Sequence, residues 1–357
     1  MLTLDQFDYY LPPKLIAQQP VAQRDKSRLL VLDRQTGKIT HHHFYDLPNL
    51  LSANDVIVRN NTKVIPARIF GQKITGGQIK LLLTKRLTMQ EKQETWECLT
   101  KPGLKLGQKI TFANSSLVAI CTQITGYTRK ISFNQTQTEL FQSLEKIGHT
   151  PIPPYITCIK DEMRLRKLYQ TTYARHQGSV AAPTAGLHFT PKLDLELQKR
   201  GIQIEEITLH VGLGTFLPVK ETDITKHHLH EEQFSLPEDV AMRLNQAKQA
   251  QKKIVAVGTT TTRVLENCVK NGKLVPMTGE TNLYIHPPHQ FQFVDSLITN
   301  FHLPKSTLLM LVTAFVSQPN TSHQFKKFQN SSAGRAYQTA ITEKYRFYSF
   351  GDAMLIR

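Results

Sequence analysis

The chain has 357 residues, which is enough for two domains or for one large domain carrying an insertion. Its 44 Lys and Arg residues outnumber its 28 Asp and Glu residues, giving a formal net charge of +16. The basic residues are spread along the chain, which argues against a disordered basic tail and favours a folded positive surface and a polyanionic partner. A basic proteome or a solubility device is the alternative.

The four cysteines lie far apart and form no CxxC pair, so neither a zinc ribbon nor a disulfide framework is supported. The first residues lack a positive leader followed by an apolar core, and no signal peptide is expected. No apolar run approaches the ~18 residues that a membrane helix needs. We therefore expect a cytoplasmic protein with reduced cysteines and no membrane partner.

The first third of the chain reads as short strands. Alternating apolar runs at Arg28–Asp33 and Lys38–Phe44 predict a hairpin, and Asp55–Arg59 and Val64–Phe70 predict two further strands. Between residues 71 and 137, short apolar runs recur and are separated by turn signals, which is the spacing of a small barrel or sandwich. A helix is predicted only at Thr138–Ile147.

From Asp161 onward the pattern changes to alternating helices and strands. The predicted elements are a helix at Asp161–Arg175, a helix capped by Thr190 and closed by Gly201, a strand at Ile207–Val211, a helix at Pro237–Gln251, a strand at Lys253–Val257 and a helix at Arg263–Lys270. The sequence thus predicts an α/β main domain (residues 1–70 plus 151–357) with an inserted small all-β, barrel-like domain (residues 71–150).

Two loops combine small residues with one histidine each. They are Gly178–Phe189, which contains His188, and Ile207–Phe216, which contains His210. Glycine and alanine remove side-chain bulk where a backbone must approach a ligand, so the two loops together suggest a binding site. Strand alternation places His210 and Gly212 on the face opposite the apolar residues.

A third candidate is the strand-to-helix junction that precedes Arg263. The run Gly258–Thr262 offers free backbone N–H groups and four threonine hydroxyls at a helix start, which suit a carboxylate or phosphate. The alternative is a heavily capped helix with a surface arginine.

Histidines also cluster at His227–Glu232, where a strand would place His228, His230 and Glu232 on one face. A zinc site would need a further ligand and an organised second shell, so acid/base or orienting roles are favoured over metal binding, and solvated histidines are the other alternative.

Toward the C-terminus, His302 is either a core histidine or a functional one. It lies beside Asn300 between two apolar runs. The aromatic run Tyr345–Phe350 is interpreted as packing, with a cation-binding face as the alternative.

Taken together, these segments resemble the S-adenosylmethionine:tRNA ribosyltransferase-isomerase family of queuosine synthesis, in order and from end to end. The matching segments are Arg24–Leu30, Asn60–Arg68, Gly178–Phe189, Thr208–Phe216, Gly258–Thr260 with Arg263, Thr299–Pro304 and Tyr345–Met354. The sequence departs from the family pattern at Lys80, at Pro287-Pro288-His289, at Thr261-Thr262 and at Leu229.

The resemblance implies a tRNA partner that carries 7-aminomethyl-7-deazaguanine at the wobble position. The enzyme would transfer the ribosyl part of S-adenosylmethionine to that base and isomerise it, giving epoxyqueuosine with release of adenine and methionine. S-adenosylmethionine would be consumed as a substrate, and no bound cofactor or metal is implied. The family's fold is similar to an α/β domain with an inserted barrel, and a monomer is expected.

Such a reaction requires a base, an acid for the departing purine and an anion clamp. As hypotheses, His188 and His210 are candidates for the acid and base, Glu232 for the base or the sulfonium partner, and His302 for a further catalytic group. Substrate binding is expected at Asn61, Pro183, Thr184, Gly186, Gly212, His228, Thr259, Thr260, Arg263 and Asn300.

Two other functions fit parts of the sequence. A non-catalytic RNA-binding protein would explain the charge but would not depend on S-adenosylmethionine. A metal-dependent hydrolase could use four of the histidines (His188, His210, His228 and His230) and would lose its activity with a chelator.

Overall fold

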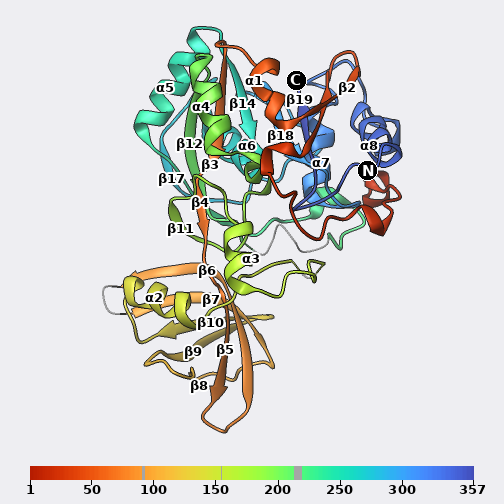
Figure 1. Ribbon diagram of the computed structural model, residues 1–357. Helices are drawn as coiled ribbons and strands as arrows, with labels where there is room; N and C mark the ends of the chain where they lie inside the picture. The colour runs from red at the N-terminus through yellow and green to blue at the C-terminus, as the bar shows by residue number, and fades with distance from the viewer. Residues whose placement is uncertain (91–92, 154, 213–218) are drawn as a thin grey trace.

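The computed structural model describes residues 1–357 except 91–92, 154 and 213–218. It has a larger part, which contains both chain ends and a nine-stranded sheet, and a smaller part formed by a closed barrel (Figure 1). The predicted fold class, an α/β domain with an inserted barrel, is confirmed. Among the described helices, none combines the length and the apolar character that crossing a bilayer requires.

The large sheet is mostly parallel at its centre. Its order is β17 (Met277–Thr281), β13 (Glu232–Leu236), β12 (Gln203–Leu209), β3 (Asp55–Asn60), β14 (Lys253–Val257), β18 (Ser296–Asn300), β19 (Ala353–Ile356), β1 (Arg28–Leu32) and β2 (Ile39–His43). Strands β12, β3, β14 and β18 run parallel to one another, and β19 runs antiparallel to β18. The carboxyl ends of these four parallel strands therefore meet along one edge of the sheet.

Both faces of this sheet are covered, so its central strands carry apolar residues on both faces. Val56 and Val58 belong to the core on one side, and Ile57 between them belongs to the core on the other. The first side carries α5 (Glu238–Gln249), α6 (Gly258–Cys268), α7 (Thr307–Phe315) and α8 (Ser332–Thr342). The second side carries α1 (Leu47–Leu50) and α4 (Pro191–Lys199).

The barrel closes on itself in the order β10-β7-β6-β5-β8-β9. Its strands are β5 (Arg68–Lys73), β6 (Gln78–Gln90), β7 (Gln93–Lys101), β8 (Lys109–Thr111), β9 (Val118–Thr125) and β10 (Thr128–Phe133), and α2 (Gln137–Ile147) follows. Trp96 is fully buried in its core and meets Phe141 of α2 at a centroid distance of 6.4 Å. The helix is held at its start by Thr136, which accepts a hydrogen bond from the Glu139 backbone.

The chain leaves and re-enters the large part at one narrow crossing. Strand β4 (Thr62–Val64) pairs with β11 (His176–Ser179), and Arg68 forms a bridge with His149. A Cβ at Gly148 would lie 2.2 Å from the Pro66 carbonyl oxygen, so only glycine lets the two passing segments approach this closely.

Several sequence predictions are confirmed in detail. Strands β1 and β2 form the N-terminal hairpin, and Thr190 caps α4 by accepting a hydrogen bond from Leu193 at 3.2 Å. Gly201 has φ +76°, as expected of a residue that closes a helix.

Other boundaries were wrong. The helix predicted at Asp161–Arg175 is α3 (Glu162–Leu168), because the fully buried Tyr169 ends it and the chain then turns back toward β11. The strand predicted at Val64–Phe70 is split into β4 and β5. Helix α6 begins at Gly258 rather than Arg263, and it ends at Cys268 before a small hairpin of β15 (Val269–Lys270) and β16 (Lys273–Leu274).

Seven short 3-10 helices complete the described structure. They are η1 (Leu4–Phe7), η2 (Pro13–Leu15), η3 (Arg24–Lys26), η4 (Phe44–Asp46), η5 (Thr184–His188), η7 (Ile224–Lys226) and η8 (Phe328–Asn330). Of these, η5 matters most for the site, because it crosses the carboxyl edge of the sheet.

Candidate active site

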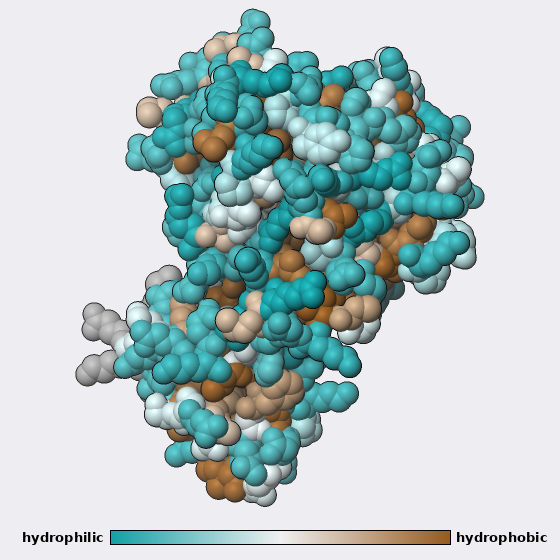
Figure 2. All heavy atoms as spheres, in the orientation of Figure 1, coloured by the Kyte–Doolittle hydropathy of each residue, from teal (hydrophilic) through white to brown (hydrophobic). Residues whose placement is uncertain are grey.

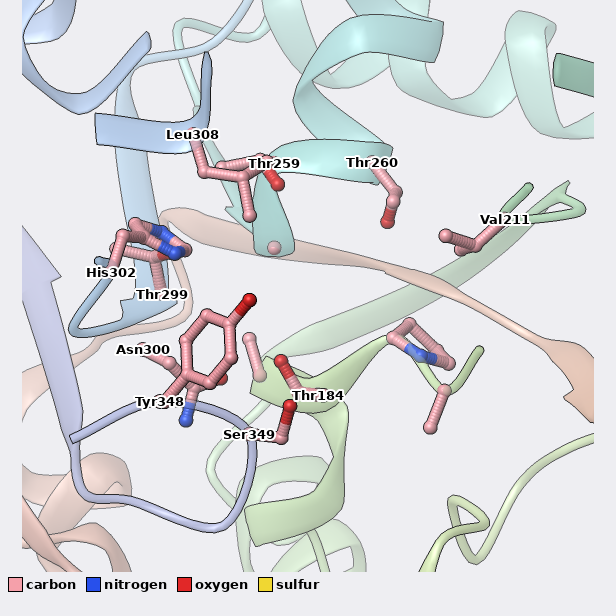
Figure 3. Close-up of a pocket in the computed structure, with 14 residues that line it drawn as sticks. Thr184, Val211, Thr259, Thr260, Thr299, Asn300, His302, Leu308, Tyr348 and Ser349 are labelled. Carbon is pink, nitrogen blue, oxygen red and sulfur yellow. The ribbon is translucent and has the colours of Figure 1, made fainter. Parts of the chain in front are cut away.

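A pocket lies at the carboxyl edge of the large sheet, where parallel α/β sheets commonly bind their ligands. Figure 3 shows side chains entering it from β18, α6, η5 and the C-terminal loop. We call it the edge pocket. It is lined by Ala182, Pro183, Thr184, Ala185, Val211, Gly258, Thr259, Thr260, Thr299, Asn300, His302, Leu308, Tyr348 and Ser349.

The start of α6 forms one wall of the edge pocket. Gly258 has φ +86°, a conformation that favours glycine, and it lets β14 pass directly into the helix. The first-turn backbone N–H groups are free of a side-chain cap, because the residue preceding the helix is Val257. Thr259 and Thr260 line the pocket, as expected for an anion site.

The next two threonines turn away from the pocket. The hydroxyls of Thr261 and Thr262 donate to the carbonyl oxygens of Val257 and Gly258, at 2.7 and 3.1 Å, and both side chains are fully buried. The four-threonine cluster expected from the sequence is therefore a pair facing the pocket and a pair bonded within the helix.

Asn300 ends β18 and forms part of the opposite wall. Its side-chain nitrogen donates to Nε2 of His188 at 3.3 Å and to the carbonyl oxygen of Asp352 at 3.4 Å. Its side-chain oxygen is buried and has no hydrogen-bond partner among the described residues. Asn300 is 2% exposed, so this acceptor is available only to something inside the pocket.

His188 lies behind Asn300 and does not line the pocket. Its Nδ1 is 2.7 Å from the Ser27 hydroxyl, and its ring stacks on Phe44 at 4.9 Å. Burial, together with the positive charges of Arg346 and Arg24, lowers the pKa of His188 to about 3. The imidazole is therefore neutral at neutral pH and is placed to orient Asn300.

His302 does line the edge pocket. Its Nε2 is 2.9 Å from the Thr299 hydroxyl, and its backbone N–H donates to the Tyr337 hydroxyl at 3.0 Å. Burial lowers the pKa of His302 to about 3, so it is also neutral at neutral pH.

The C-terminal loop supplies two wall residues that the sequence analysis did not select, Tyr348 and Ser349. Tyr348 has φ +73°, an uncommon conformation for a residue with a large side chain. Its ring packs on Tyr155 with centroids 4.3 Å apart, and its backbone N–H donates to the Phe301 carbonyl at 3.0 Å. The aromatic run at 345–350 was the available signal. Packing was the favoured interpretation of that run. For Tyr348 this interpretation is incomplete, because the residue also lines the pocket.

A second cavity lies where the barrel meets the large part, and we call it the junction cavity. The molecule narrows between these two parts (Figure 2). The junction cavity is lined by Lys63, Arg86, Gln137, Thr138, Phe141, Gln142, Glu145, Arg175, His176, Gln177 and His210. Three of these carry permanent positive charge and one carries negative charge, so the cavity suits a polyanion.

His210 faces this junction cavity rather than the edge pocket. Its Nδ1 is 2.7 Å from the Thr62 hydroxyl, and burial, followed by the charges of His176 and Arg86, lowers its pKa to about 4. The next residue, Val211, lines the edge pocket. The segment after β12 therefore separates the two cavities, with the side chains of consecutive residues on opposite sides.

Glu232 and Arg263 form a buried ion pair. The carboxylate accepts from the guanidinium and from the Gly212 backbone N–H at 2.9 Å, and the Arg263 Nε–H donates to the Leu283 carbonyl at 2.9 Å. Arg263 does not line the edge pocket, because α6 begins one turn earlier than predicted. Of the two parts of the expected anion clamp, the start of α6 therefore lines the pocket and Arg263 does not.

The other predicted binding residues occupy different positions. Pro183 and Thr184 line the edge pocket. The Asn61 amide bonds Glu206 and Thr208, at 3.3 and 2.8 Å, and so joins β3 to β12. A Cβ at Gly186 would lie 2.0 Å from the Tyr173 hydroxyl, which gives that glycine a packing reason.

The histidine cluster at 227–232 is not one strand face. His228 and His230 are exposed, and β13 begins only at Glu232. The metal-hydrolase alternative needs four histidines close together. Instead, His188 contacts Asn300, His210 contacts Thr62, and His228 and His230 lie on the exposed segment before β13. Within the described residues, no group of three or more His, Cys, Asp and Glu side chains could hold a metal ion. Residues 213–216 of the second predicted loop fall outside the described structure.

Comparisons with known proteins cover nearly the whole chain. The family model described as "Queuosine biosynthesis protein" matches residues 4–356. A Carboxydothermus hydrogenoformans protein named S-adenosylmethionine:tRNA ribosyltransferase-isomerase is 47% identical, over 99% of this chain and 100% of the relative. A Fusobacterium nucleatum protein of the same name is 45% identical, over 99% and 96%.

One solved structure is similar over the same length. The crystal structure of an S-adenosylmethionine tRNA ribosyltransferase from Thermotoga maritima is 35% identical and has a TM-score of 0.55, covering 99% of this chain and 100% of its own.

Proposed function

The chain belongs to the queuosine biosynthesis protein family, and we propose that it is an S-adenosylmethionine:tRNA ribosyltransferase-isomerase. It transfers the ribosyl group of S-adenosylmethionine to 7-aminomethyl-7-deazaguanine at the wobble position of a tRNA and isomerises it. The products are epoxyqueuosine in the tRNA, adenine and methionine.

The observation that carries this proposal is the pairing of two unlike cavities across one short segment. The described lining of the edge pocket, on the Val211 side, contains no Lys, Arg, Asp or Glu. The junction cavity, on the His210 side, is basic. A transferase that joins a small substrate to an RNA needs both sites to be adjacent.

The charges around the edge pocket suit those of S-adenosylmethionine. A sulfonium cation is repelled by arginine and lysine, and in a chain of net charge +16 the lining avoids both. Thr259, Thr260 and the free N–H groups of α6 would hold the carboxylate of the methionine part. The loop at Pro183–Thr184 would lie against the nucleoside.

The junction cavity suits the tRNA strand around the modified base. Lys63 and Arg175 would contact phosphates, which gives affinity without sequence preference, whereas Arg86 is already paired with the buried Glu94. His210 would accept a proton from the aminomethyl group, whose neutral form is the nucleophile. Burial is the main cause of the low pKa of His210, and the charges of His176 and Arg86 lower it further, so phosphates near these groups would raise it only in part.

His302 and Glu232 stay candidates for the remaining proton transfers. His302 lines the edge pocket, which supports a direct role, and its neutral form could accept a proton from the carbon beside the sulfonium. Glu232 acts through Arg263 and Gly212, which supports a positioning role. S-adenosylmethionine is consumed, and we propose neither a bound cofactor nor a metal.

We also propose that the enzyme works as a monomer in the cytoplasm. The family resemblance supports the monomer, and the tRNA substrate, which is found in the cytoplasm, supports the compartment. Size-exclusion chromatography with light scattering, with and without tRNA, tests the oligomeric state.

The decisive test of the proposed function needs no variant. The purified protein is incubated with S-adenosylmethionine and a tRNA that carries the aminomethyl-deazaguanine base, without added metal. We expect adenine release that requires the tRNA, and a nucleoside whose mass increases by the rearranged ribosyl unit. A folded protein that binds the tRNA and releases no adenine would instead be an RNA-binding protein.

A further inference from the structure

We propose that the side-chain oxygen of Asn300 accepts a hydrogen bond from the exocyclic amino group of adenine, with the ring of Tyr348 as the flat surface beside it. This inference rests on the proposed function and extends it, because it assigns the two ends of S-adenosylmethionine to the two walls of the edge pocket.

The orientation of the Asn300 amide is fixed by its neighbours. A carbonyl oxygen can only accept, so the Asp352 carbonyl, 3.4 Å away, must face the amide nitrogen. The same nitrogen is 3.3 Å from His188 Nε2. Both contacts lie on the nitrogen side, and the oxygen is therefore the atom left for the pocket.

A buried oxygen without a partner favours a ligand that brings an N–H or O–H donor. Leaving such a group unpaired is costly, and over nine-tenths of buried polar groups find a partner. Asn300 is 2% exposed, its oxygen has no partner among the described residues, and it lines the same pocket as the start of α6. The pocket thus offers donors on one wall and an acceptor on another.

The two walls select the two ends of the substrate. Thr259 and Thr260 lie on one side of the pocket, and Asn300 and Tyr348 lie on the opposite side (Figure 3). The amino acid carboxylate is drawn to α6, and the ammonium group shares a carbon with it, so both stay near that wall. The donors that remain are the ribose hydroxyls and the adenine amino group, and we assign the amino group to Asn300 because the ring of Tyr348 beside it offers a flat surface for a purine.

Tyr348 fits the same assignment. Its backbone has φ +73°, an uncommon conformation for a residue with a large side chain, at a position that lines the pocket. Tyr155 packs against the ring on one side, and Ala182 and Ala185 line the pocket with small apolar groups. A purine between the tyrosine and these alanines would bury both of its faces.

His188 acts here as a positioning residue. Because Asn300 donates to its Nε2, the proton is on Nδ1, which donates to the Ser27 hydroxyl. The imidazole therefore holds the amide nitrogen and keeps the oxygen turned toward the pocket.

The first experiment uses the unaltered protein and unreactive probes. S-adenosylhomocysteine and its analogue with hydrogen in place of the 6-amino group are compared as competitive inhibitors of tRNA-dependent adenine release. Because neither probe reacts, differences in leaving-group chemistry do not enter. We expect the analogue to bind about tenfold more weakly, or worse. Equal inhibition constants in an active enzyme would overturn the inference and leave the proposed function standing.

Variants then test whether Asn300 causes the difference between the two inhibition constants. Asn300→Leu should bring the ratio of the two inhibition constants close to one, and Asn300→Ala serves if the leucine variant does not fold. The matched control is Asn245→Leu, which removes a side-chain amide that bonds the Leu274 backbone at 2.8 and 2.9 Å, and it should keep the ratio. A ratio unchanged in both Asn300 variants would contradict the assignment.

Two variants at His188 test its positioning role. Gln can still accept a hydrogen bond from the Asn300 nitrogen, whereas Leu cannot. His188→Leu should therefore lower the ratio and His188→Gln should keep it, and equal ratios in the two variants would remove His188 from the assignment. Absence of adenine release by the unaltered protein would be a failure of the proposed function instead.

Discussion

The imidazole of His210 occupies the space in which a side chain at residue 178 would begin. A Cβ at Gly178 would lie 2.9 Å from Cε1 and 3.0 Å from Nδ1 of His210, and the backbone there has φ +151°. The two histidine-bearing loops seen in the sequence thus meet at this contact, because the glycine of the first receives the ring of the second. The orientation of His210 toward the junction cavity depends on it.

Gly178→Ala should displace the His210 ring and lower kcat by about tenfold or more, while costing about 1–3 kcal/mol of stability. Adenine release and urea unfolding measure the two effects. Gly279→Ala is the matched control, because a Cβ there meets nothing within 4 Å. Normal turnover by a folded Gly178→Ala protein would show that the ring position is unimportant.

The buried neutral histidines predict a loss of stability in acid. The pKa values of His188, His210 and His302 are about 3, 4 and 3 in the folded protein, against about 6.5 when unfolded. Between those values the unfolded chain binds more protons, so stability falls as the pH falls below about 6.5. Going from pH 7.5 to 5.5 should cost somewhat over ~1 kcal/mol for each histidine, or about 4 kcal/mol together.

Urea unfolding at the two pH values measures this loss. His302→Gln should reduce it by about a third, and replacing the exposed His228 by Gln should leave it unchanged. If the loss were the same in the His302 variant, the pKa of His302 in the folded protein would have to be close to its value in the unfolded chain.

Glu232→Gln separates a structural from a catalytic role for this carboxylate. It leaves the guanidinium of Arg263 buried without its counter-charge, and we expect a loss of about 3–5 kcal/mol. The double variant with Arg263→Met should recover part of that stability, since no charge is then left unpaired. A variant with normal stability and a greatly reduced single-turnover rate would instead make Glu232 catalytic.

The two pairs of threonines in α6 provide an internal comparison. Changing both Thr259 and Thr260 to Val should raise the KM for S-adenosylmethionine by about tenfold, because hydroxyl donors to the carboxylate are lost. Thr261→Val with Thr262→Val should leave KM unchanged, since those hydroxyls bond within the helix. Decarboxylated S-adenosylmethionine should be insensitive to the first pair, and an equal rise in KM for both substrates would argue against carboxylate binding.

Lys63→Gln and Arg175→Gln test the junction cavity as the tRNA site. Each should weaken tRNA binding and reduce the slope of log K against log salt by about 1. Lys253→Gln is the control, because Lys253 is exposed at the amino end of β14 and does not line the junction cavity. Unchanged slopes in both variants would place the RNA elsewhere on the basic surface.

The sequence alone determined the features that depend on neighbouring residues. Strand alternation, the Thr190 cap, the glycine that closes α4 and the change of texture at the barrel are local patterns, and each reappears in the structure. The family resemblance was equally accessible, because its motifs are short contiguous runs.

Tertiary structure decided which polar groups meet. Arg263 looked free to bind an anion, yet Glu232 holds it, and His188 looked catalytic, yet it lies behind Asn300. Tyr348 entered the site only through the path of the C-terminal loop. A buried polar group must find its partner wherever the fold brings one, here 31 to 112 residues away along the chain, and spacing in the sequence does not encode that choice.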